Sequence, residues 1–370
     1  MQIDRLELYH FRSYDHAEAF FVPDVNLIVG ENAQGKTNLL EAICYLSCGR
    51  SFRTRKEAEL IRFGSEYAEL NCSVTGADRE QTMKTILFAN RRPRQLYLSG
   101  VKKKTAAELN GVLTTVLFCP EDLLLLKNGA AGRRKFVDTA LCQMRPQYAK
   151  ALAEYQRLQD QKSRILKDRI FQPSLMEILP EYNQRMAQVG AVLIYYRARF
   201  LDSMAQQAAI FHQEFSGGRE SMQIAYQTVS TVTNPMASAQ TIYGQLLEHQ
   251  KLHERAELES MQCLSGPHKD DFEVCLNERS VRAFGSQGQT RTAAISLKLA
   301  ERELMRLDSG EEPVLLLDDV LSELDAGRQD FVLNKIQSGQ VFITCCEQGR
   351  FPNLGQVLTI ENGSIRKETL

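Results

Sequence analysis

The sequence predicts an α/β protein in which two groups of strands are separated by a helical segment. Short apolar runs of the kind that form strands lie toward both ends of the 370-residue chain. Between them, residues 147–167 and 181–215 place apolar side chains at helical spacing among many Gln, Arg and Glu residues. The predicted fold class is therefore an α/β unit split by an inserted, compact helical lobe.

The first group of strands begins close to the N-terminus. Residues 3–8 alternate apolar and charged side chains, and residues 19–22 and 25–29 are short apolar runs, the second of which ends at Gly30. Residues 38–46 then show helical spacing of their leucines and isoleucine. Further strands are expected at 67–74, 82–89, 95–98 and 114–118, with turns at 76–78, 90–93 and 99–100.

The two central helices are each too short for the long coiled-coil arm of an SMC protein, which favours a compact lobe. After the lobe, residues 314–317 and 341–344 are apolar runs typical of buried strands, with a helical stretch at 327–336 between them. The expected boundaries are 1–128 for the N-terminal part of the α/β unit, 129–261 for the lobe and 262–370 for the C-terminal part.

Composition excludes some classes of protein and leaves others open. No basic segment leads into an apolar one at the N-terminus, and no run approaches about 18 apolar residues, so neither export nor a membrane partner is expected. Nine cysteines without a CxxC pair favour a reducing cytoplasm over disulfides or a zinc site. With a net charge of −1, any nucleic-acid site must be a local patch.

The strongest motif is a complete phosphate-binding loop, GxxxxGKT, placed between a predicted strand and a predicted helix. Glycines let backbone N–H groups curl around phosphate oxygens, the lysine reaches the β and γ phosphates, and the hydroxyl ligates Mg²⁺. The predicted ATP-binding residues are Gly30, Glu31, Asn32, Ala33, Gln34, Gly35, Lys36 and Thr37.

Two weaker motifs follow in the C-terminal part. An apolar strand ends in Asp318 and Asp319, where the first acid would hold Mg²⁺ together with Thr37 and the second would polarise the attacking water. Many buried strands end in Asp, so this pattern is not specific on its own. The segment of Ser286, Gly288 and Gln289 precedes a helix expected at 290–302, and a helix N-terminus of this kind binds anions or is simply polar.

The order of the motifs is more specific than any one of them. A phosphate loop, a long intervening segment, SxGQ, a helix, Asp-Asp and then Ser322-Glu323-Leu324-Asp325 resemble the P-loop, signature, Walker B and D-loop of ABC ATPases. This resemblance implies that the signature of one copy caps the γ-phosphate held by another. Ser286 and Gly288 are then expected to act in trans, in an ATP-dependent homodimer.

Several further segments resemble the RecF family of ABC/SMC-like ATPases along the whole chain. They are Phe11-Arg12-Ser13-Tyr14, Ser51-Phe52-Arg53, Pro120-Glu121-Asp122-Leu123, Arg133 to Asp138, Gly266 to Asp271, Phe284 to Thr292 and Leu315 to Asp325. The resemblance implies an ATPase head that dimerises on ATP, binds DNA as single strand, duplex or junction, and partners RecR and RecO in loading RecA at gaps.

Two departures from the general ABC pattern bear on turnover. Asp319 stands where many ABC enzymes carry Glu, which shortens the reach toward water and predicts slow hydrolysis. Thr344 falls near the switch position usually held by His, and a threonine there offers only a neutral hydrogen bond to the γ-phosphate.

Basic clusters supply the candidate DNA contacts, each with a structural alternative. They are Arg91, Arg92 and Arg94 with Lys102 to Lys104; Arg50, Arg53, Arg55 and Lys56; and Arg133, Arg134 and Lys135. Phosphates would be attracted there without base readout, but a hairpin edge protected by lysines and solvated helix surfaces explain the same residues. His268 faces either the nucleotide or the partner, or lies in a polar turn before a strand at 272–276.

Two competing functions share these motifs. The ATPase subunit of a membrane transporter would place Walker B much closer to the P-loop than this chain does. A nucleotide-gated scaffold without meaningful hydrolysis is harder to separate, because Asp319 is the shorter acid.

Overall fold

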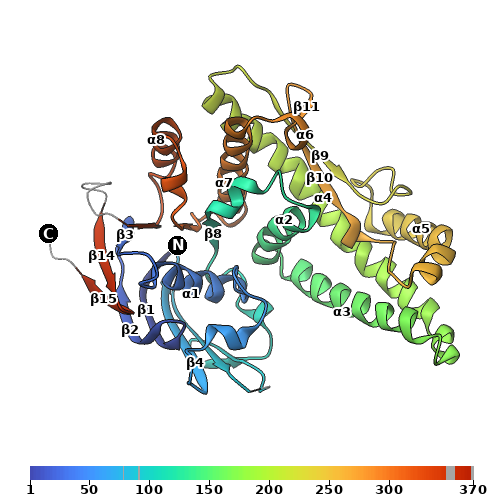
Figure 1. The fold of residues 1–370 in the computed structure, drawn as a ribbon, viewed down its shortest axis with the longest axis horizontal. Helices are drawn as coiled ribbons and strands as arrows, with labels where there is room; N and C mark the ends of the chain where they lie inside the picture. The colour runs from blue at the N-terminus through green and yellow to red at the C-terminus, as the bar shows by residue number, and fades with distance from the viewer. Residues whose placement is uncertain (78, 91, 347–354, 368–370) are drawn as a thin grey trace. The chain divides into compact units, whose positions relative to one another are not determined.

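A computed structural model of the chain describes residues 1–77, 79–90, 92–346 and 355–367 (Figure 1). The chain forms two compact units, one made of Met1–Leu124 with Ala294–Leu370 and the other of Leu125–Ala293. We call them the head unit and the inserted unit. Two residues of the predictions lie outside the described residues: Asp78 of the expected turn at 76–78, and Arg91 of the first basic cluster.

The head unit contains an antiparallel sheet of six strands in the order β2-β1-β4-β5-β6-β7. Its strands are β1 (Gln2–Phe11), β2 (Tyr14–Phe20), β4 (Tyr67–Thr75), β5 (Glu80–Phe88), β6 (Gln95–Leu98) and β7 (Val101–Lys103). The strand expected at 19–22 therefore begins earlier, at Tyr14, and ends at Phe20. A tight turn pairs Phe11 with Tyr14. Because Asp15, His16 and Glu18 are exposed and polar, the start of this strand has no apolar run from which it could be predicted.

A second six-stranded sheet of the head unit has the order β15-β14-β3-β13-β12-β8. Its strands are β3 (Val25–Val29), β8 (Thr115–Phe118), β12 (Val314–Leu317), β13 (Val341–Cys345), β14 (Gln356–Glu361) and β15 (Ser364–Lys367). All neighbouring pairs are parallel except β14 with β15. The two apolar runs expected as buried strands are confirmed as β12 and β13, in which every residue is buried.

Helix α1 (Lys36–Cys48) lies between these two sheets, because it contacts β8 and β13 of one and β4 and β5 of the other. This position explains why ten of its 13 residues are buried. Leu39, Leu40 and Ile43 join the main apolar core with residues of both sheets. Figure 1 shows α8 (Ala326–Lys335) on the side of the parallel sheet away from α1.

The inserted unit is mainly helical, but it also contains a small antiparallel sheet. Its elements are α2 (Ala130–Met144), α3 (Pro146–Asp168), α4 (Leu179–Ser216), α5 (Ala239–Ser260), α6 (Val281–Phe284), and the sheet β11-β10-β9 of β9 (Met222–Gln227), β10 (Asp271–Leu276) and β11 (Arg279–Ser280). Helix α4 packs against α2, α3, α5 and β9. Helix α7 (Gln287–Ser309) begins in this unit and continues into the head unit.

Strand pairing accounts for the difference between the expected lobe, 129–261, and the inserted unit. β10 pairs along its whole length with β9, so residues after 261 are tied to the helices by backbone hydrogen bonds. An ionic network strengthens this tie, since Arg197 of α4 bonds to Asp138 of α2 at 2.8 Å and to Asp270 beside β10 at 2.7 Å. No helix among the described residues has the length and apolar character needed to cross a membrane.

Candidate nucleotide-binding site

The predicted phosphate loop lies in the head unit, between the end of β3 and the start of α1. At Gly30 a Cβ atom would approach the carbonyl oxygen of Ile360 to 2.5 Å, and Gly35 has a φ of 120°. A side chain at Gly35 would also meet the Ser13 hydroxyl at 2.8 Å. Both glycines are therefore required by the close approach of neighbouring segments and, at Gly35, by the backbone conformation.

Lys36 is the first residue of α1, and its side chain is 7% exposed. Its ammonium group donates hydrogen bonds to the carbonyl oxygens of Gly30 at 2.5 Å and Glu31 at 2.9 Å. The lysine thus bonds back to the first two residues of its own loop. A phosphate in this loop would meet both the ammonium group and the N–H groups at the start of α1.

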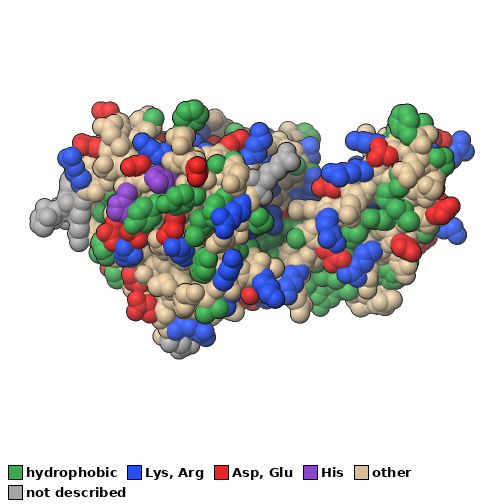
Figure 2. All heavy atoms as spheres, turned by 90° about the horizontal axis from the view of Figure 1, so that it is seen from below, with side chains coloured by type: hydrophobic (Ala, Val, Ile, Leu, Met, Phe, Trp, Pro, Cys, Tyr) green, Lys and Arg blue, Asp and Glu red, His purple; other side chains and the backbone are tan. Residues whose placement is uncertain are grey.

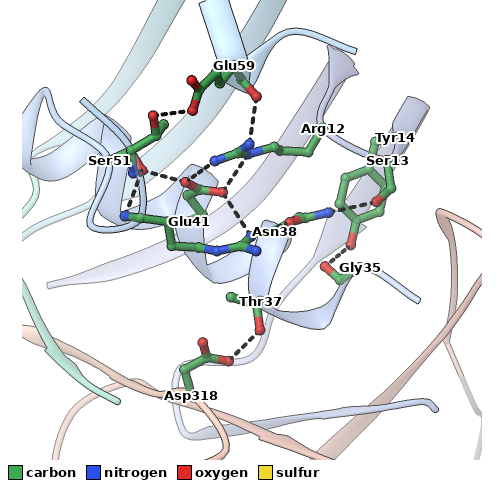
Figure 3. Close-up of polar contacts among 12 residues, drawn as sticks. Arg12, Ser13, Tyr14, Gly35, Thr37, Asn38, Glu41, Ser51, Glu59 and Asp318 are labelled. Carbon is green, nitrogen blue, oxygen red and sulfur yellow. Dashed lines mark hydrogen bonds and ion pairs between the residues drawn. The ribbon is translucent and has the colours of Figure 1, made fainter. Parts of the chain in front are cut away.

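Thr37 and Asp318 meet across the site, although they are 281 residues apart in the chain. The Thr37 hydroxyl donates to Asp318 Oδ1 at 3.0 Å, as Figure 3 shows. A hydroxyl and a carboxylate at this distance are the oxygen donors that suit Mg²⁺. Burial raises the pKa of Asp318, against the hydrogen bonds from Thr37 and Thr344, which lower it.

Thr344 contacts both residues of the Walker B pair, the carboxylate of Asp318 and the backbone of Asp319. Its hydroxyl donates to Asp318 Oδ1 at 3.1 Å and accepts the backbone N–H of Asp319 at 2.8 Å. The Thr344 hydroxyl therefore supports Asp318, and its hydrogen bond to a γ-phosphate stays a prediction. Asp319 has a φ of 52°, and its carboxylate makes no cap hydrogen bond to the turn that follows.

Gln34 joins the phosphate loop to the C-terminal hairpin of β14 and β15. Its side-chain oxygen accepts the backbone N–H of Asn362 at 2.6 Å, and its carbonyl oxygen accepts that of Gly363 at 3.4 Å. On the other side of the loop, Cys346 lies 3.2 Å from the Asn32 side-chain oxygen. The loop is therefore braced by residues from the far end of the sequence.

Glu41 is a residue of this site that sequence reasoning missed. Its carboxylate is fully buried, and Arg12 binds it through two hydrogen bonds of 2.8 Å each (Figure 3). Ser51 also donates to it, and Arg53 lies 3.4 Å from its second oxygen while donating to Asn38 at 2.8 Å. The only signal in the sequence is a charged residue on an otherwise apolar helix.

The second missed residue is Tyr14, which supports the phosphate loop from β2. Its buried hydroxyl donates to the carbonyl oxygen of Gly35 at 2.9 Å (Figure 3). Desolvation raises the pKa of this phenol, so it remains a neutral donor. Nothing in the spacing of the motifs marks Tyr14, because its contact depends on the fold of the hairpin.

The signature segment lies in the inserted unit, where α7 begins at Gln287 rather than at the expected residue 290. Ser286 N–H donates to the Gln289 side-chain oxygen at 2.9 Å, and Gln289 N–H donates to the Ser286 hydroxyl at 3.2 Å. These reciprocal bonds form a capping box. Gln289 thus supports the helix end, and its predicted nucleotide contact stays a prediction, while Ser286 is exposed.

The D-loop segment leads into α8 of the head unit. Asp325 is the N-cap of this helix and accepts the backbone N–H of Arg328 at 3.1 Å. The Ser322 hydroxyl donates to the carbonyl oxygen of Asp319 at 2.5 Å. The D-loop is thus fixed to the second Walker B acid by a direct hydrogen bond.

His268 lies in the inserted unit and is held by neighbours on both sides. Its ring nitrogens lie 2.7 Å from the Tyr155 hydroxyl and 2.9 Å from the carbonyl oxygen of Cys263. Burial lowers the pKa of His268 to about 4. The polar-turn interpretation fits these contacts, because both ring nitrogens are occupied within the unit.

The basic clusters differ in how far their charges are available. Arg133 is 2% exposed and forms a bidentate pair with Asp271 at 2.6 and 2.8 Å, and Arg134 donates to the carbonyl oxygen of Asp270 at 2.6 Å. Arg133 is therefore a buried structural cation and neither a DNA contact nor a solvated helix residue, whereas Arg134 is half-buried and keeps part of its surface. Lys135 is exposed.

The hairpin cluster is also divided. Arg94 turns inward to Tyr45 at 2.8 Å and Glu57 at 2.5 Å, whereas Arg92 is exposed and stacks on Phe88 at 4.4 Å. Of the lysines, 102 and 104 are exposed on or beside the edge strand β7. On the face seen in Figure 2, Lys and Arg side chains are interspersed with Asp and Glu and form no single continuous patch.

Comparison with known proteins places this geometry in a family. The model of the RecF/RecN/SMC N-terminal domain matches residues 2–366. The DNA replication and repair protein RecF of Lacticaseibacillus paracasei is 38% identical over 93% of this chain and 92% of its own length. That of Clostridioides difficile is 35% identical over 99% of this chain and 98% of its own length.

Solved structures agree with this assignment. The recombination mediator protein RecF in its RecF-ATPrS form has a TM-score of 0.93 and 32% identity, covering 100% of this chain and 98% of its own, and the RecF-ATP form has a TM-score of 0.91. An Smc head domain from Pyrococcus furiosus, 17% identical with a TM-score of 0.57, covers 100% of this chain and 96% of its own and shows the shared fold alone. The chain has the ABC/SMC-like ATPase fold and belongs to the RecF family.

Proposed function

We propose that this chain is a slow, DNA-associated ATPase that dimerises on ATP at DNA gaps and helps to load the RecA recombinase. The observation that carries the proposal is the meeting of Thr37, Asp318, Thr344 and Asp319 across the full length of the chain. A phosphate loop, an Mg²⁺ donor pair and a second acid are the parts that phosphoryl transfer to water requires. ATP-bound RecF structures among the relatives support ATP as the nucleotide.

The residues divide the work as follows. Lys36 and the loop from Gly30 to Gly35 would hold the phosphates, and Thr37 with Asp318 would hold Mg²⁺, which would supply positive charge to offset the negative charge that develops on the phosphates. Asp319 orients the attacking water and accepts its proton. Its short side chain fits slow turnover.

The inserted unit contributes the second half of the site in trans. Ser286 is exposed at the N-terminus of α7, where the helix dipole and the first-turn amides favour an anion. A single chain carries one phosphate loop and one such helix end, so two copies are needed to enclose two nucleotides. The expected order of events is closure of the dimer on DNA with ATP and reopening after hydrolysis.

DNA would contact the chain through its phosphates, with Arg92, Lys102 and Lys104 as the candidate cations of the head unit. The relatives' description as DNA replication and repair proteins supports DNA as the partner. RecR and RecO are proposed as protein partners on the family resemblance. The cytoplasm is proposed as the location on the same resemblance and because none of the nine cysteines, all of which are described, forms a disulfide.

The decisive measurement is the molar mass in solution with and without ATP and Mg²⁺, repeated with a short gapped duplex. Wild-type protein is expected to double its mass with ATP. Asp319→Asn is expected to hold the dimer longer, because hydrolysis is blocked after closure. A protein that binds ATP but remains monomeric with and without DNA would exclude the trans role of Ser286 and Gly288.

A second candidate is a nucleotide-gated scaffold that closes on ATP without meaningful hydrolysis. It is favoured by the left-handed backbone at Asp319, which combines a strained position with a short acid. Single-turnover hydrolysis on a DNA-bound sample separates the two. Release of phosphate that disappears in Asp319→Asn supports the enzyme, and equal rates in both proteins support the scaffold.

A further inference from the structure

The side chain of Gln289 is fully engaged by two neighbours, and they use opposite ends of its amide. Its oxygen accepts the Ser286 N–H at 2.9 Å, and its nitrogen donates to Glu220 Oε1 at 2.8 Å. The Ser286 N–H can bond only to the amide oxygen, and the Glu220 carboxylate, which only accepts hydrogen bonds, must face the NH₂ group. Both neighbours therefore select the same orientation of the amide, and Glu220 supplies the contact on its NH₂ side.

Glu220 is itself held in place by a buried histidine. The second carboxylate oxygen of Glu220 lies 2.9 Å from Nε2 of His212, which is fully buried on α4. The backbone N–H of Glu220 donates to the Ser216 hydroxyl at 3.3 Å. Burial lowers the pKa of His212, so the ring is neutral at neutral pH and carries its proton on Nε2, where the carboxylate accepts it.

The charge of Glu220 is also maintained by these contacts. Burial would raise the pKa of this carboxyl, but the hydrogen bonds from Gln289 and His212 outweigh it and hold the pKa below its usual value. His212 and Gln289 therefore both donate to the carboxylate of Glu220, and the second of these bonds reaches the signature segment. All three residues belong to the inserted unit.

We propose that Glu220, backed by His212, is a positioning residue that fixes the Gln289 amide and thereby the N-terminus of α7. With the amide oriented, the Ser286 N–H is satisfied within the capping box. The Ser286 hydroxyl accepts from Gln289 N–H, which leaves its own hydrogen to donate to a phosphate oxygen. This inference rests on the proposed trans role of Ser286 and adds two residues, 212 and 220, that lie far from the phosphate loop in sequence.

A charge exchange tests the proposal without removing either side chain. Gln289→Glu places two carboxylates within hydrogen-bond distance, whereas Glu220→Gln together with Gln289→Glu reverses the pair and restores one donor between them. In the double variant the carboxylate at position 289 still accepts the Ser286 N–H, and the amide at position 220 still accepts from His212. Glu248→Gln on α5, an exposed glutamate of the same unit, is the matched control.

Two readouts are measured on the full chain. Gln289→Glu is expected to speed hydrogen exchange at the Ser286 amide and to weaken the ATP-dependent dimer, each by about tenfold, since loss of a hydrogen bond to a charged group costs at least that factor. Single-turnover hydrolysis should fall while ATP affinity of the monomer stays unchanged, because the phosphate loop is not altered. The double variant should return all values to within about twofold of wild type.

The outcomes separate this inference from the proposed function. If Gln289→Glu leaves Ser286 exchange unchanged, or if the double variant is no better than Gln289→Glu, Glu220 does not orient the amide and the inference is overturned. Ser286→Ala is run beside them. If it dimerises and turns over like wild type, the trans role fails, while the exchange data still decide whether Glu220 positions Gln289.

Discussion

The buried carboxylate of Glu41 should contribute measurably to the stability of the head unit. Glu41→Gln keeps the shape of the side chain but replaces one acceptor oxygen with an NH₂ group. Arg12 then loses one of its two bonds of 2.8 Å, and a donor faces its guanidinium. The variant isolates the charge from the packing of α1.

The size of the effect follows from the burial of the partners. Breaking a fully buried ion pair costs about 3–5 kcal/mol. Arg12 and Arg53 retain side-chain exposures of 19% and 45%, so water compensates for part of the loss. We expect the free energy of unfolding of the head unit to fall by about 2–3 kcal/mol, or its melting temperature by about 5–10 °C for a domain of this size.

Calorimetry gives the overall shift, and hydrogen exchange of peptides from α1 assigns it to the head unit. The local measurement matters because two units need not unfold in one step. Glu66→Gln, which makes the same chemical change at an exposed residue of the head unit, is the control. If the two variants differ by less than about 0.5 kcal/mol, the reasoning about buried charge at Glu41 is refuted.

Three other changes give distinct outcomes. Burial raises the pKa of Asp318 in the folded protein above its unfolded value, so this carboxyl lowers the stability of the fold as pH rises from the unfolded pKa through the folded pKa. Asp318→Asn should therefore stabilise the nucleotide-free protein at pH 7 by about 0.5–2 kcal/mol. The same change should abolish hydrolysis. A lower denaturation midpoint would contradict the expected stabilisation. Arg133→Ala should cost about 2–3 kcal/mol in urea denaturation, because it removes a buried side chain and the bidentate partner of the half-buried Asp271, which keeps Arg282 at 3.8 Å as a cationic neighbour. Lys135→Ala should cost under about 0.5 kcal/mol, and equal losses would contradict the assignment. Replacing Lys102 and Lys104 with Glu should weaken DNA binding and reduce the slope of log K against log salt by about one for each DNA phosphate that is no longer neutralised; an unchanged slope removes this segment from the site.

The motifs predicted the chemistry of the site because their residues are defined by local spacing. Lys36 and Thr37 follow from GxxxxGKT, and Asp318 follows from an apolar strand that ends in acid. The central helices were also predictable, since 147–167 and 181–215 agree with α3 and α4 to within two residues at each end. In each case the periodicity of one segment was sufficient.

Residues whose role depends on distant partners could not be predicted in the same way. Glu41, Tyr14 and Glu220 each act through a side chain that the fold brings close from another segment. Arg133 was left open between a DNA contact and a solvated helix surface, because its actual partner, Asp271, is 138 residues away. Spacing along one segment carries no information about such pairs.

The order of strands in the parallel sheet has a consequence for synthesis. β3, which carries the phosphate loop, has β13 and β14 as its neighbours, and the bond from Asn362 to Gln34 spans 328 residues. At about 5–20 residues per second, a ribosome needs some tens of seconds to make the intervening chain. The inserted unit is one continuous segment, so it can fold before β13 and β14 have been made and can pair with β3. During that interval β3 of the nascent chain is an unpaired apolar strand, and the brace on the phosphate loop forms only after residue 362 has been made.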